Sequence, residues 1–540
     1  MKKKIIFSVL AIGIFFTTVS FKNDFFEVAK QIEIFTTMFK ELNMNYVDEV
    51  TPATLMDKAI KGMLEDLDPY TIYWNEQEVE DARIKNSGTY TGIGASVQTL
   101  ADKIIVVEPF QGYPADEAGL KAGDEIIRIG NTNLSDFEDD AGELLKGAAG
   151  TTVELTYVRQ GKTQTTSLVR KKVAEKAVPF FKLLDDNIGY IVLTKFNRTT
   201  TRETKAALES LKLDGAEKII LDLRGNPGGL LNEAINIVNL FVPKGEVITT
   251  TKSVIEKYNK TYSTQNEPVD TEIPLVVLVN GRSASASEIV SGGLQDLDRA
   301  VIVGARSFGK GLVQRPKKLT YGTQLKVTIS RYYTPSGRCI QALDYWNRDE
   351  NGDPIRLDPK EYNAFKTKGG RTVYDGGGIL PDIEVETAKF SPITTALLKD
   401  NAIFDYATQY YYEHEMKDSS NFKFTDSDFQ DFLQFLKKND FSYETETEKE
   451  FAEALRRSED DDLKKHIEGS YKQLISSIES AKEKALVDKK AEIKSLLSDE
   501  ILKRYFYRDG LYNYQVKHNP EILEAIAVLK DANKYNRILK

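Results

Sequence analysis

The chain has 540 residues, 41% of them hydrophobic and 29% charged, so it can bury several cores and is not a disordered chain. Its 73 basic and 82 acidic residues give a net charge of −9, which excludes a general electrostatic footprint for nucleic acid. Cys339 is the only cysteine, so intramolecular disulfides and thiolate metal cages are excluded. Length alone suggests about three or four domains.

The first predicted element is a secretory signal at residues 1–21. Three lysines at positions 2–4 precede an uncharged, mostly apolar stretch at 5–21, which is typical of an export signal. Residues 18–20 form only a weak cleavage site, and the apolar stretch is almost long enough to stay as a membrane anchor. We therefore expect export to the periplasm or cell envelope and leave open whether the signal is cleaved or anchors the protein.

Residues 22–86 show the spacing of amphipathic helices. Leu55, Ala59, Met63 and Leu67 recur at helical intervals, with charged residues between them. We predict an N-terminal helical region, which either packs on the core or joins copies of the chain into an oligomer.

Residues 87–172 form short alternating strands with glycine turns. The segment 114–127 has the pattern of a short helix, a turn and a strand, and it resembles the signature of a PDZ domain. Gly92, Ile93 and Gly94 would then be the loop whose backbone N–H groups bind the carboxylate of a peptide, while a sheet edge accepts that peptide as an added strand. The alternative is an ordinary turn between two strands.

Residues 173–390 alternate between strands and helices. Strands that are apolar throughout predict a sheet covered by helices on both faces, and hence an α/β core. The predicted strands are 188–193, 219–223, 275–279 and 300–303, and the predicted helices are 201–211, 230–240 and 287–297.

Residues 391–540 are strongly charged and contain helical runs at 481–497 and 520–529. We interpret this C-terminal extension as a solvated helical appendage, with docking or oligomerisation as the alternative.

Ser285 lies between the predicted strand 275–279 and the helix that follows, so its hydroxyl is expected at the carboxyl edge of the sheet. The alternative is structural, because Ser285 and Glu288 also form the pattern of a capping box, in which the serine only satisfies helix N–H groups. Ser283 and Ser287 are competing nucleophiles.

A serine needs a base, and the usual base is scarce here. The only histidines, His414, His466 and His518, all lie in the C-terminal extension. Lys310 follows Ser285 by 25 residues in a glycine-rich loop, and burial would lower its pKa enough for it to act as the base.

The loop at 304–310 also matches the phosphate-binding pattern Gly-x-x-x-x-Gly-Lys. Gly311 replaces the magnesium-binding Ser or Thr, and the next residues look extended, not helical. Both departures argue against a nucleotide site.

Several further motifs occur in a fixed order around these two residues. They are Leu67-Asp68-Pro69, Asp222 to Gly229, Arg331 to Gly337 and Leu380-Pro381-Asp382. Together with the spacing of Ser285 and Lys310, they resemble the carboxy-terminal processing proteases, which are tail-specific serine peptidases with a Ser-Lys dyad and an inserted PDZ domain. The resemblance covers about residues 40–385.

This resemblance implies a role for each matching residue. Ser285 would be the nucleophile and Lys310 the base, and Gln314 would hold the lysine amine. The oxyanion hole would be formed by the N–H groups of Ala286 and Gly229, with Gly228 as the alternative to Gly229.

We therefore predict a mixed α/β multidomain protein, in which an α/β serine protease core carries an inserted β-rich PDZ domain, N-terminal helices and a helical C-terminal extension. Its expected function is ATP-independent cleavage near the apolar C-termini of protein or peptide substrates, without cofactor or metal. The alternative is a non-catalytic PDZ scaffold or adaptor of the cell envelope.

Overall fold

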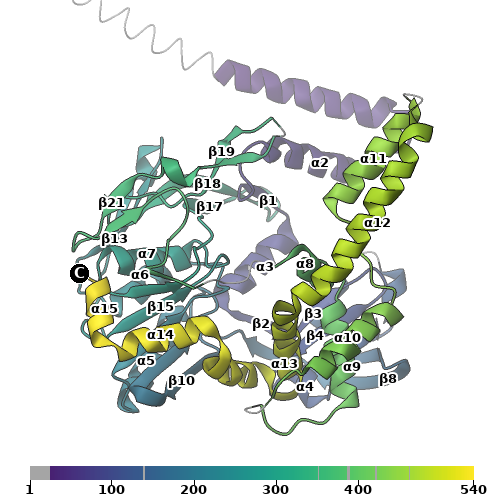
Figure 1. Ribbon diagram of the computed structural model, residues 1–540. Helices are drawn as coiled ribbons and strands as arrows, with labels where there is room; N and C mark the ends of the chain where they lie inside the picture. The colour runs from purple at the N-terminus through teal and green to yellow at the C-terminus, as the bar shows by residue number, and fades with distance from the viewer. Residues whose placement is uncertain (1–24, 138–139, 351, 386–389, 420–421, 461–462) are drawn as a thin grey trace, which may run out of the picture. The chain divides into compact units, whose positions relative to one another are not determined.

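The computed structural model describes residues 25–137, 140–350, 352–385, 390–419, 422–460 and 463–540 (Figure 1). The predicted signal at 1–21 lies outside these residues. The chain divides into two compact units, of which the first comprises Met1–Glu76 and Gln314–Thr328 and the second comprises Gln77–Val313 and Ile329–Lys540. Within the described ranges, no helix is long and apolar enough to cross a membrane.

The described N-terminal segment of the first unit is mostly helical, as the helical spacing predicted. A helix covers 25–45, α2 covers Pro52–Glu65, and the short strand β1 covers Ile72–Trp74. β1 pairs antiparallel with residues 324–326, at the start of β18 (Gln324–Tyr333). The carboxylate of Asp68 accepts hydrogen bonds from the backbone N–H groups of Tyr70 and Thr71, and it thereby fixes the turn that leads into β1.

The second unit is built on a six-stranded sheet, in which all strands but one are parallel. β10 pairs antiparallel with β11, and the strand order is β10-β11-β12-β15-β16-β23. The strands are β10 Phe180–Leu184, β11 Ile188–Val192, β12 Lys218–Asp222, β15 Leu275–Val279, β16 Val301–Gly304 and β23 Ile383–Glu384. A smaller sheet joins β13 (Val247–Lys252) to β14 (Lys260–Ser263) and to residues 331–333 of β18.

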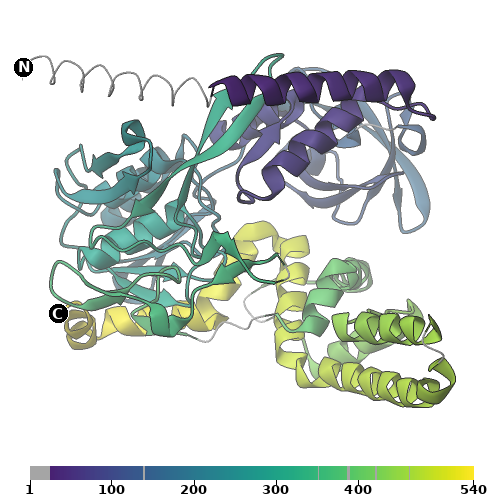
Figure 2. The same ribbon diagram turned by 90° about the horizontal axis from the view of Figure 1, so that it is seen from above.

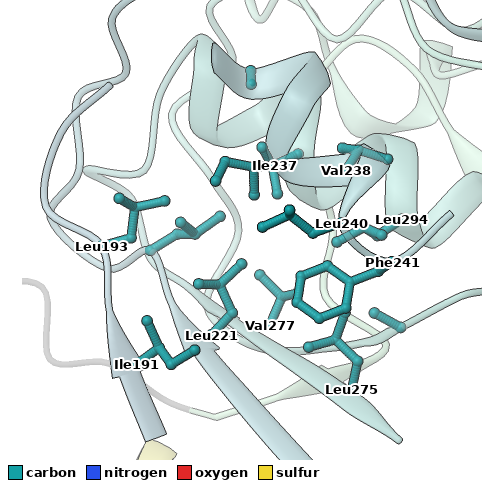
Figure 3. Packing of buried hydrophobic residues seen from close by; sticks show 14 of the residues in the cluster. Ile191, Leu193, Leu221, Ile237, Val238, Leu240, Phe241, Leu275, Val277 and Leu294 are labelled. Atoms are coloured by element: carbon teal, nitrogen blue, oxygen red, sulfur yellow. The ribbon is translucent and has the colours of Figure 1, made fainter. Parts of the chain in front are cut away.

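Both faces of the parallel sheet are covered, which explains why its central strands are apolar throughout. Alternate strand residues such as Ile191, Leu221 and Val277 pack against one layer of helices (Figure 3). That layer consists of α5 Thr200–Leu213, α6 Leu231–Asn239 and α7 Ala286–Asp296. The strand residues that alternate with these, including Ile220 and Val276, face the opposite side of the sheet. Each fully buried aliphatic side chain contributes roughly 1.5–3 kcal/mol.

The opposite face is covered by the end of the chain. Ile522, Ala525 and Val528 of α14 are fully buried against this face. Figures 1 and 2 show α14 (Pro520–Lys530) and α15 (Ala532–Ile538) in yellow along the sheet. The interpretation of the extension as a solvated appendage is therefore wrong for these two helices, because they complete the core.

The remaining helices of the extension have a hydrophobic core of their own. Buried aromatic residues such as Tyr406, Phe429 and Phe432 pack against Leu497 and Ile501 of α13. The helices are α8 Pro392–Lys399, α9 Ala402–Glu413, α10 Asp426–Lys438, α11 Glu446–Asp460, α12 Lys464–Asp488 and α13 Lys490–His518. The single helical run predicted at 481–497 is divided at Lys489.

Residues 87–172 contain a separate β-sheet around a small core. Its strand order is β3-β4-β5-β7-β8, and Ile104, Ile126 and Leu155 are completely buried inside it. The strands are β3 Ala95–Thr99, β4 Ile104–Pro109, β5 Glu125–Ile129, β7 Thr152–Arg159 and β8 Lys162–Val169, with the short helices α4 Pro114–Glu117 and η2 Ala141–Leu145.

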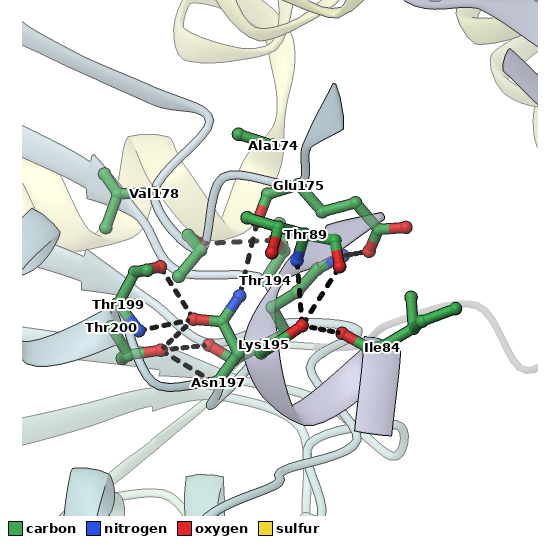
Figure 4. Close-up of polar contacts among 12 residues, drawn as sticks. Ile84, Thr89, Ala174, Glu175, Val178, Thr194, Lys195, Asn197, Thr199 and Thr200 are labelled. Carbon is green, nitrogen blue, oxygen red and sulfur yellow. Dashed lines mark hydrogen bonds and ion pairs between the residues drawn. The ribbon is translucent and has the colours of Figure 1, made fainter. Parts of the chain in front are cut away.

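The chain enters and leaves this sheet through a two-stranded ladder of β2 (Thr89–Gly92) and β9 (Lys171–Ala174). Asn197, from the parallel-sheet core, lies where the two segments meet (Figure 4). Its amide donates to the carbonyl of Glu175 at 3.3 Å, and a Cβ on Gly88 would lie 2.3 Å from its Nδ2 atom. The β-rich domain is thus an insertion whose two ends are held at one point of the core.

Candidate active site

Ser285 lies at the sharp turn between β15 and α7, as predicted. Its backbone has φ 54° and ψ −109°, a conformation that residues other than glycine rarely adopt. Such strain persists only where the surroundings hold it in place, and it is characteristic of functional sites. Ser285 is partly exposed, whereas the neighbouring Ala284 and Ala286 are buried.

The carboxylate of Glu288 supplies those surroundings. It is completely buried, and its Oε2 atom accepts hydrogen bonds from the backbone N–H of Ser285 at 2.7 Å and of Lys310 at 2.9 Å. Its Oε1 atom accepts from the hydroxyl of Ser307 and the N–H of Gly309, both at 2.6 Å. Burial raises the pKa of Glu288, while these donors favour the charged form.

Two consequences follow from this arrangement. The backbone nitrogens of Ser285 and Lys310 share one acceptor atom, so they are separated by no more than the sum of its two hydrogen-bond lengths. The capping box that was the structural alternative for Ser285 also has a wider role than predicted, because Glu288 joins the nucleophile turn to the lysine loop.

The lysine loop is held tightly at its glycines. Gly309 has φ 87°, and a Cβ there would lie 2.4 Å from the Cβ of Ala342. Lys310 is partly buried, and the strand β17 (Leu312–Lys318) begins two residues later. A phosphate-binding loop is followed by a helix, so this strand contradicts the nucleotide alternative.

The glycine loop after β12 lies directly against the nucleophile turn. A Cβ on Gly228 would lie 2.9 Å from the backbone nitrogen of Ala286 and 3.0 Å from the Cβ of Ser285. Gly229 has φ 148° and pairs with Phe196. Among the described residues, the N–H groups of Gly229 and Ala286 donate to no other atom, so both are available to an oxyanion.

Gln314 belongs to the first unit. Its side-chain amide donates to the hydroxyl of Thr328 at 3.1 Å, and that hydroxyl donates to the carboxylate of Asp68 at 3.0 Å. The sequence did not indicate this chain of bonds. The role of Gln314 towards Lys310 stays a prediction.

The loop of Gly92, Ile93 and Gly94 precedes β3, which is an edge strand and pairs with β4 alone among the strands that the structure describes. An edge strand can accept a peptide as an additional strand. Gly94 has φ 75°, and a Cβ there would lie 2.3 Å from the Cβ of Tyr113, so this position requires glycine. The geometry is compatible with carboxylate binding at this loop.

Tyr90 is a residue of this loop region that the sequence did not single out. Its ring packs on Gly92, where a Cβ would lie 2.9 Å from a ring carbon. Burial raises the pKa of Tyr90 to about 12, and the backbone N–H groups of Ala95 and Gly94 act in the opposite direction.

No group of three or more His, Cys, Asp and Glu residues is placed to hold a metal ion in the described part of the chain. Asp222 and Arg224, at the two sides of the turn after β12, form an ion pair with a closest approach of 2.6 Å.

The fold and the glycine loops define an α/β peptidase core with an inserted PDZ domain, and family models match both of these parts. Residues 187–345 match peptidase family S41, and residues 91–169 match a PDZ domain. Residues 18–78 match the N-terminal domain of the activating protease CtpB, and residues 393–529 match the C-terminal helical domain of a probable PDZ-protease.

Curated relatives agree with these matches. A carboxy-terminal-processing protease of Bartonella bacilliformis is 35% identical over 354 residues, which cover 64% of this chain and 80% of the relative. The carboxy-terminal processing protease CtpA of Bacillus subtilis is 33% identical, with 56% of this chain and 65% of the relative covered. The solved structure of a photosystem II D1 C-terminal processing protease is 29% identical, covers 60% of this chain and 91% of its own, and has a TM-score of 0.35.

The chain belongs to the carboxy-terminal processing proteases of peptidase family S41. It is a serine-type peptidase with a PDZ domain, and the resemblance inferred from the motifs is confirmed. The C-terminal extension, which those motifs do not cover, matches a family model of its own.

Proposed function

We propose that this protease cleaves proteins near their C-termini by means of a Ser-Lys dyad, without ATP. Ser285 attacks the scissile carbonyl, and neutral Lys310 takes the serine proton. Lys310 then donates that proton to the leaving amine, and water hydrolyses the resulting acyl-enzyme. Gln314 positions the lysine amine.

The observation that supports this proposal best is the position of Glu288. One carboxylate fixes the backbone of the proposed nucleophile and of the proposed base, and it does so from a fully buried position. Gly229 in the glycine loop and Ala286 in the Ser285 turn each add an N–H group that donates to no acceptor among the described residues, and these two groups can bind the oxyanion of the tetrahedral intermediate.

Substrate recognition is assigned to the PDZ domain. We propose that Gly92, Ile93 and Gly94 bind the terminal carboxylate of an apolar protein tail, and that the free edge of β3 pairs with the residues preceding it. The substrate class is therefore proteins or peptides with accessible apolar C-termini.

Mass spectrometry tests the nucleophile. A loosely folded protein with an apolar C-terminus is incubated with residues 22–540, or with the same protein carrying Ser285→Ala or Lys310→Ala. We expect fragments from the parent alone, because either substitution removes the proton transfer on which attack depends. Intact substrate in every tube, with the tail still bound, would favour the non-catalytic scaffold.

We also propose that the protein is exported to the periplasm or cell envelope. The basis is the sequence of residues 1–21, and N-terminal sequencing of the fractionated protein distinguishes a cleaved signal from a membrane anchor. Assembly of copies through the helical regions stays a prediction, which the molar mass in solution tests.

A further inference from the structure

The helix α13 changes direction sharply at Tyr507. That residue has φ 55° and ψ −164°, whereas the helix continues on both sides of it. A residue other than glycine adopts this conformation only at a cost in free energy, so the kink must be held by contacts around it. The two residues at the kink, Tyr507 and Arg508, both contact the PDZ domain.

These contacts are specific and charged. The guanidinium of Arg508 donates to Glu108 of β4, from Nη2 to Oε2 at 2.6 Å and from Nε to Oε1 at 2.8 Å. The hydroxyl of Tyr507 donates to Asp116 of α4 at 2.6 Å. The segment around Asp116 is bonded in turn to the carboxylate loop, because the N–H of Ala115 donates to the carbonyl of Ile93.

The chain that leaves α13 reaches the catalytic core at a second contact. Arg224, at the start of the glycine loop after β12, donates from Nη1 to Asn519 at 2.7 Å and to Glu521 at 2.9 Å. Asn519 caps α14, and Glu521 lies in its first turn. Arg224 is 12% exposed and Glu521 is 9% exposed, so solvent screens this ion pair only weakly.

The same guanidinium also holds its own loop. Its Nη2 and Nε atoms donate to Asp222, which also accepts a 2.6 Å hydrogen bond from the hydroxyl of the buried Tyr190. Arg224 thus lies between a carboxylate of the core and a carboxylate of the C-terminal helices. Four residues further along the loop, Gly228 touches the nucleophile turn.

We propose that Asn519 and Glu521 are positioning residues for the oxyanion loop, and that the C-terminal helices connect this loop to the PDZ domain through Tyr507 and Arg508. The inference rests on the proposed function, because it assigns the loop to acyl transfer. A shift of the PDZ domain on binding a protein tail would then reach Arg224 through α13 and the start of α14.

Removing Glu521 is a fair test, because it leaves Arg224 paired with Asp222 and creates no buried charge without a partner. The fold is therefore retained, while the loop loses one of its two anchors. Since an oxyanion hole acts on the transition state and not on the bound substrate, a displaced loop lowers kcat and leaves KM nearly constant.

The first experiment measures kcat and KM of the full chain on a short internal peptide without a free apolar tail. We expect Glu521→Gln and Asn519→Ala each to lower kcat by about 10-fold to 100-fold, with KM changed less than about twofold. Lys530→Gln is the matched control, because it breaks an exposed ion pair between α14 and Asp186 that does not reach the loop. An unchanged kcat with a lower melting temperature would overturn the inference, because the contact would then be structural only.

A Ser285→Ala arm separates this inference from the proposed function. If Ser285→Ala is inactive and Glu521→Gln retains full kcat, the inference alone fails. If Ser285→Ala stays active, the proposed function fails, whatever the result for Glu521.

The second experiment tests the contact between α13 and the PDZ domain with the charge reversals Arg508→Glu and Glu108→Arg. For each variant, the rate on a substrate with an apolar tail is divided by the rate on the tail-free peptide. We expect each reversal to change this ratio by about fivefold or more, and the double reversal to restore it, because the pair re-forms with opposite polarity. A ratio that is the same in all four proteins would overturn the proposed connection.

Discussion

The turn at Ser285 and the loop at Lys310 differ from the PDZ loop at Gly92 to Gly94 in how they are held. The turn and the loop proposed for catalysis are tied together by Glu288, whose buried carboxylate accepts four hydrogen bonds. The PDZ loop lies beside an edge strand, and Tyr90 packs against it. The loops proposed for the chemistry are therefore fixed in advance, whereas the loop proposed for the substrate tail lies next to the partly exposed edge strand β3, which can exchange partner strands.

The largest effect is expected from Glu288→Gln, which tests whether Glu288 holds the Ser285 turn and the Lys310 loop in place. The amide cannot accept four hydrogen bonds, so buried donors at Ser285 and Lys310 lose their partner and the two loops separate. We expect kcat on a reporter peptide to fall by about 100-fold or more. Glu203→Gln is the matched control, because Glu203 accepts two backbone N–H groups of Ala177 and Val178 elsewhere in the core. A similar loss of kcat in both variants would contradict a specific role for Glu288.

Gly228→Ala tests the closeness of the oxyanion loop. The new Cβ would lie 2.7 Å from the carbonyl oxygen of Ala284, so the loop has to move away from Ser285. We expect kcat to fall by about 10-fold to 100-fold, measured with the same peptide. Gly215→Ala is the control, because Gly215 also has a positive φ, 98°, but no atom within 4 Å of the new Cβ. Equal losses in the two variants would mean that backbone strain, not the position of the loop, causes the effect.

Gly94→Ala tests the PDZ loop as the binding site for the substrate tail. Its Cβ would collide with Tyr113, so we expect affinity for an apolar tail peptide to weaken by about 10-fold, while cleavage of a tail-free peptide stays within about twofold. Titration calorimetry measures the first quantity and initial rates the second. Gly112→Ala, with φ 74° and open space around it, should bind the tail like the parent. Unchanged affinity in Gly94→Ala would place the carboxylate site elsewhere.

The smallest effect is on stability, and it concerns Asp499 of α13. Burial raises the pKa of this carboxyl from 3.8 to about 6, with Lys503 and Gln515 acting in the opposite direction. The folded protein therefore keeps a proton that the unfolded chain has already lost, and stability falls as the pH rises from about 4 to about 6. Asp499→Asn removes this penalty.

We expect Asp499→Asn to be more stable than the parent by about 1–3 kcal/mol at pH 7.5 and equally stable near pH 4. Differential scanning calorimetry at the two pH values measures the difference. A gain of the same size at both values would show that titration of Asp499 is not its cause.

Much of the fold was predictable because its signals are local. The strand at 275–279 was predicted with the observed bounds, and the helix after it differs by one residue at each end, since an apolar run and a capping pattern are read within a few neighbours. The positions of Ser285 and the glycine loops followed from the same signals. The family itself followed from the order of several short motifs.

The sequence by itself therefore determined the elements, the turn that carries Ser285 and the loops that require glycine, because each depends on adjacent residues. The tertiary structure alone decided which distant groups meet. Glu521 reaches Arg224 across 297 residues, and Glu288 binds a loop 19 to 22 residues away. Such pairs depend on strand order and on which face of the sheet a helix covers, and neither quantity is encoded in a local pattern.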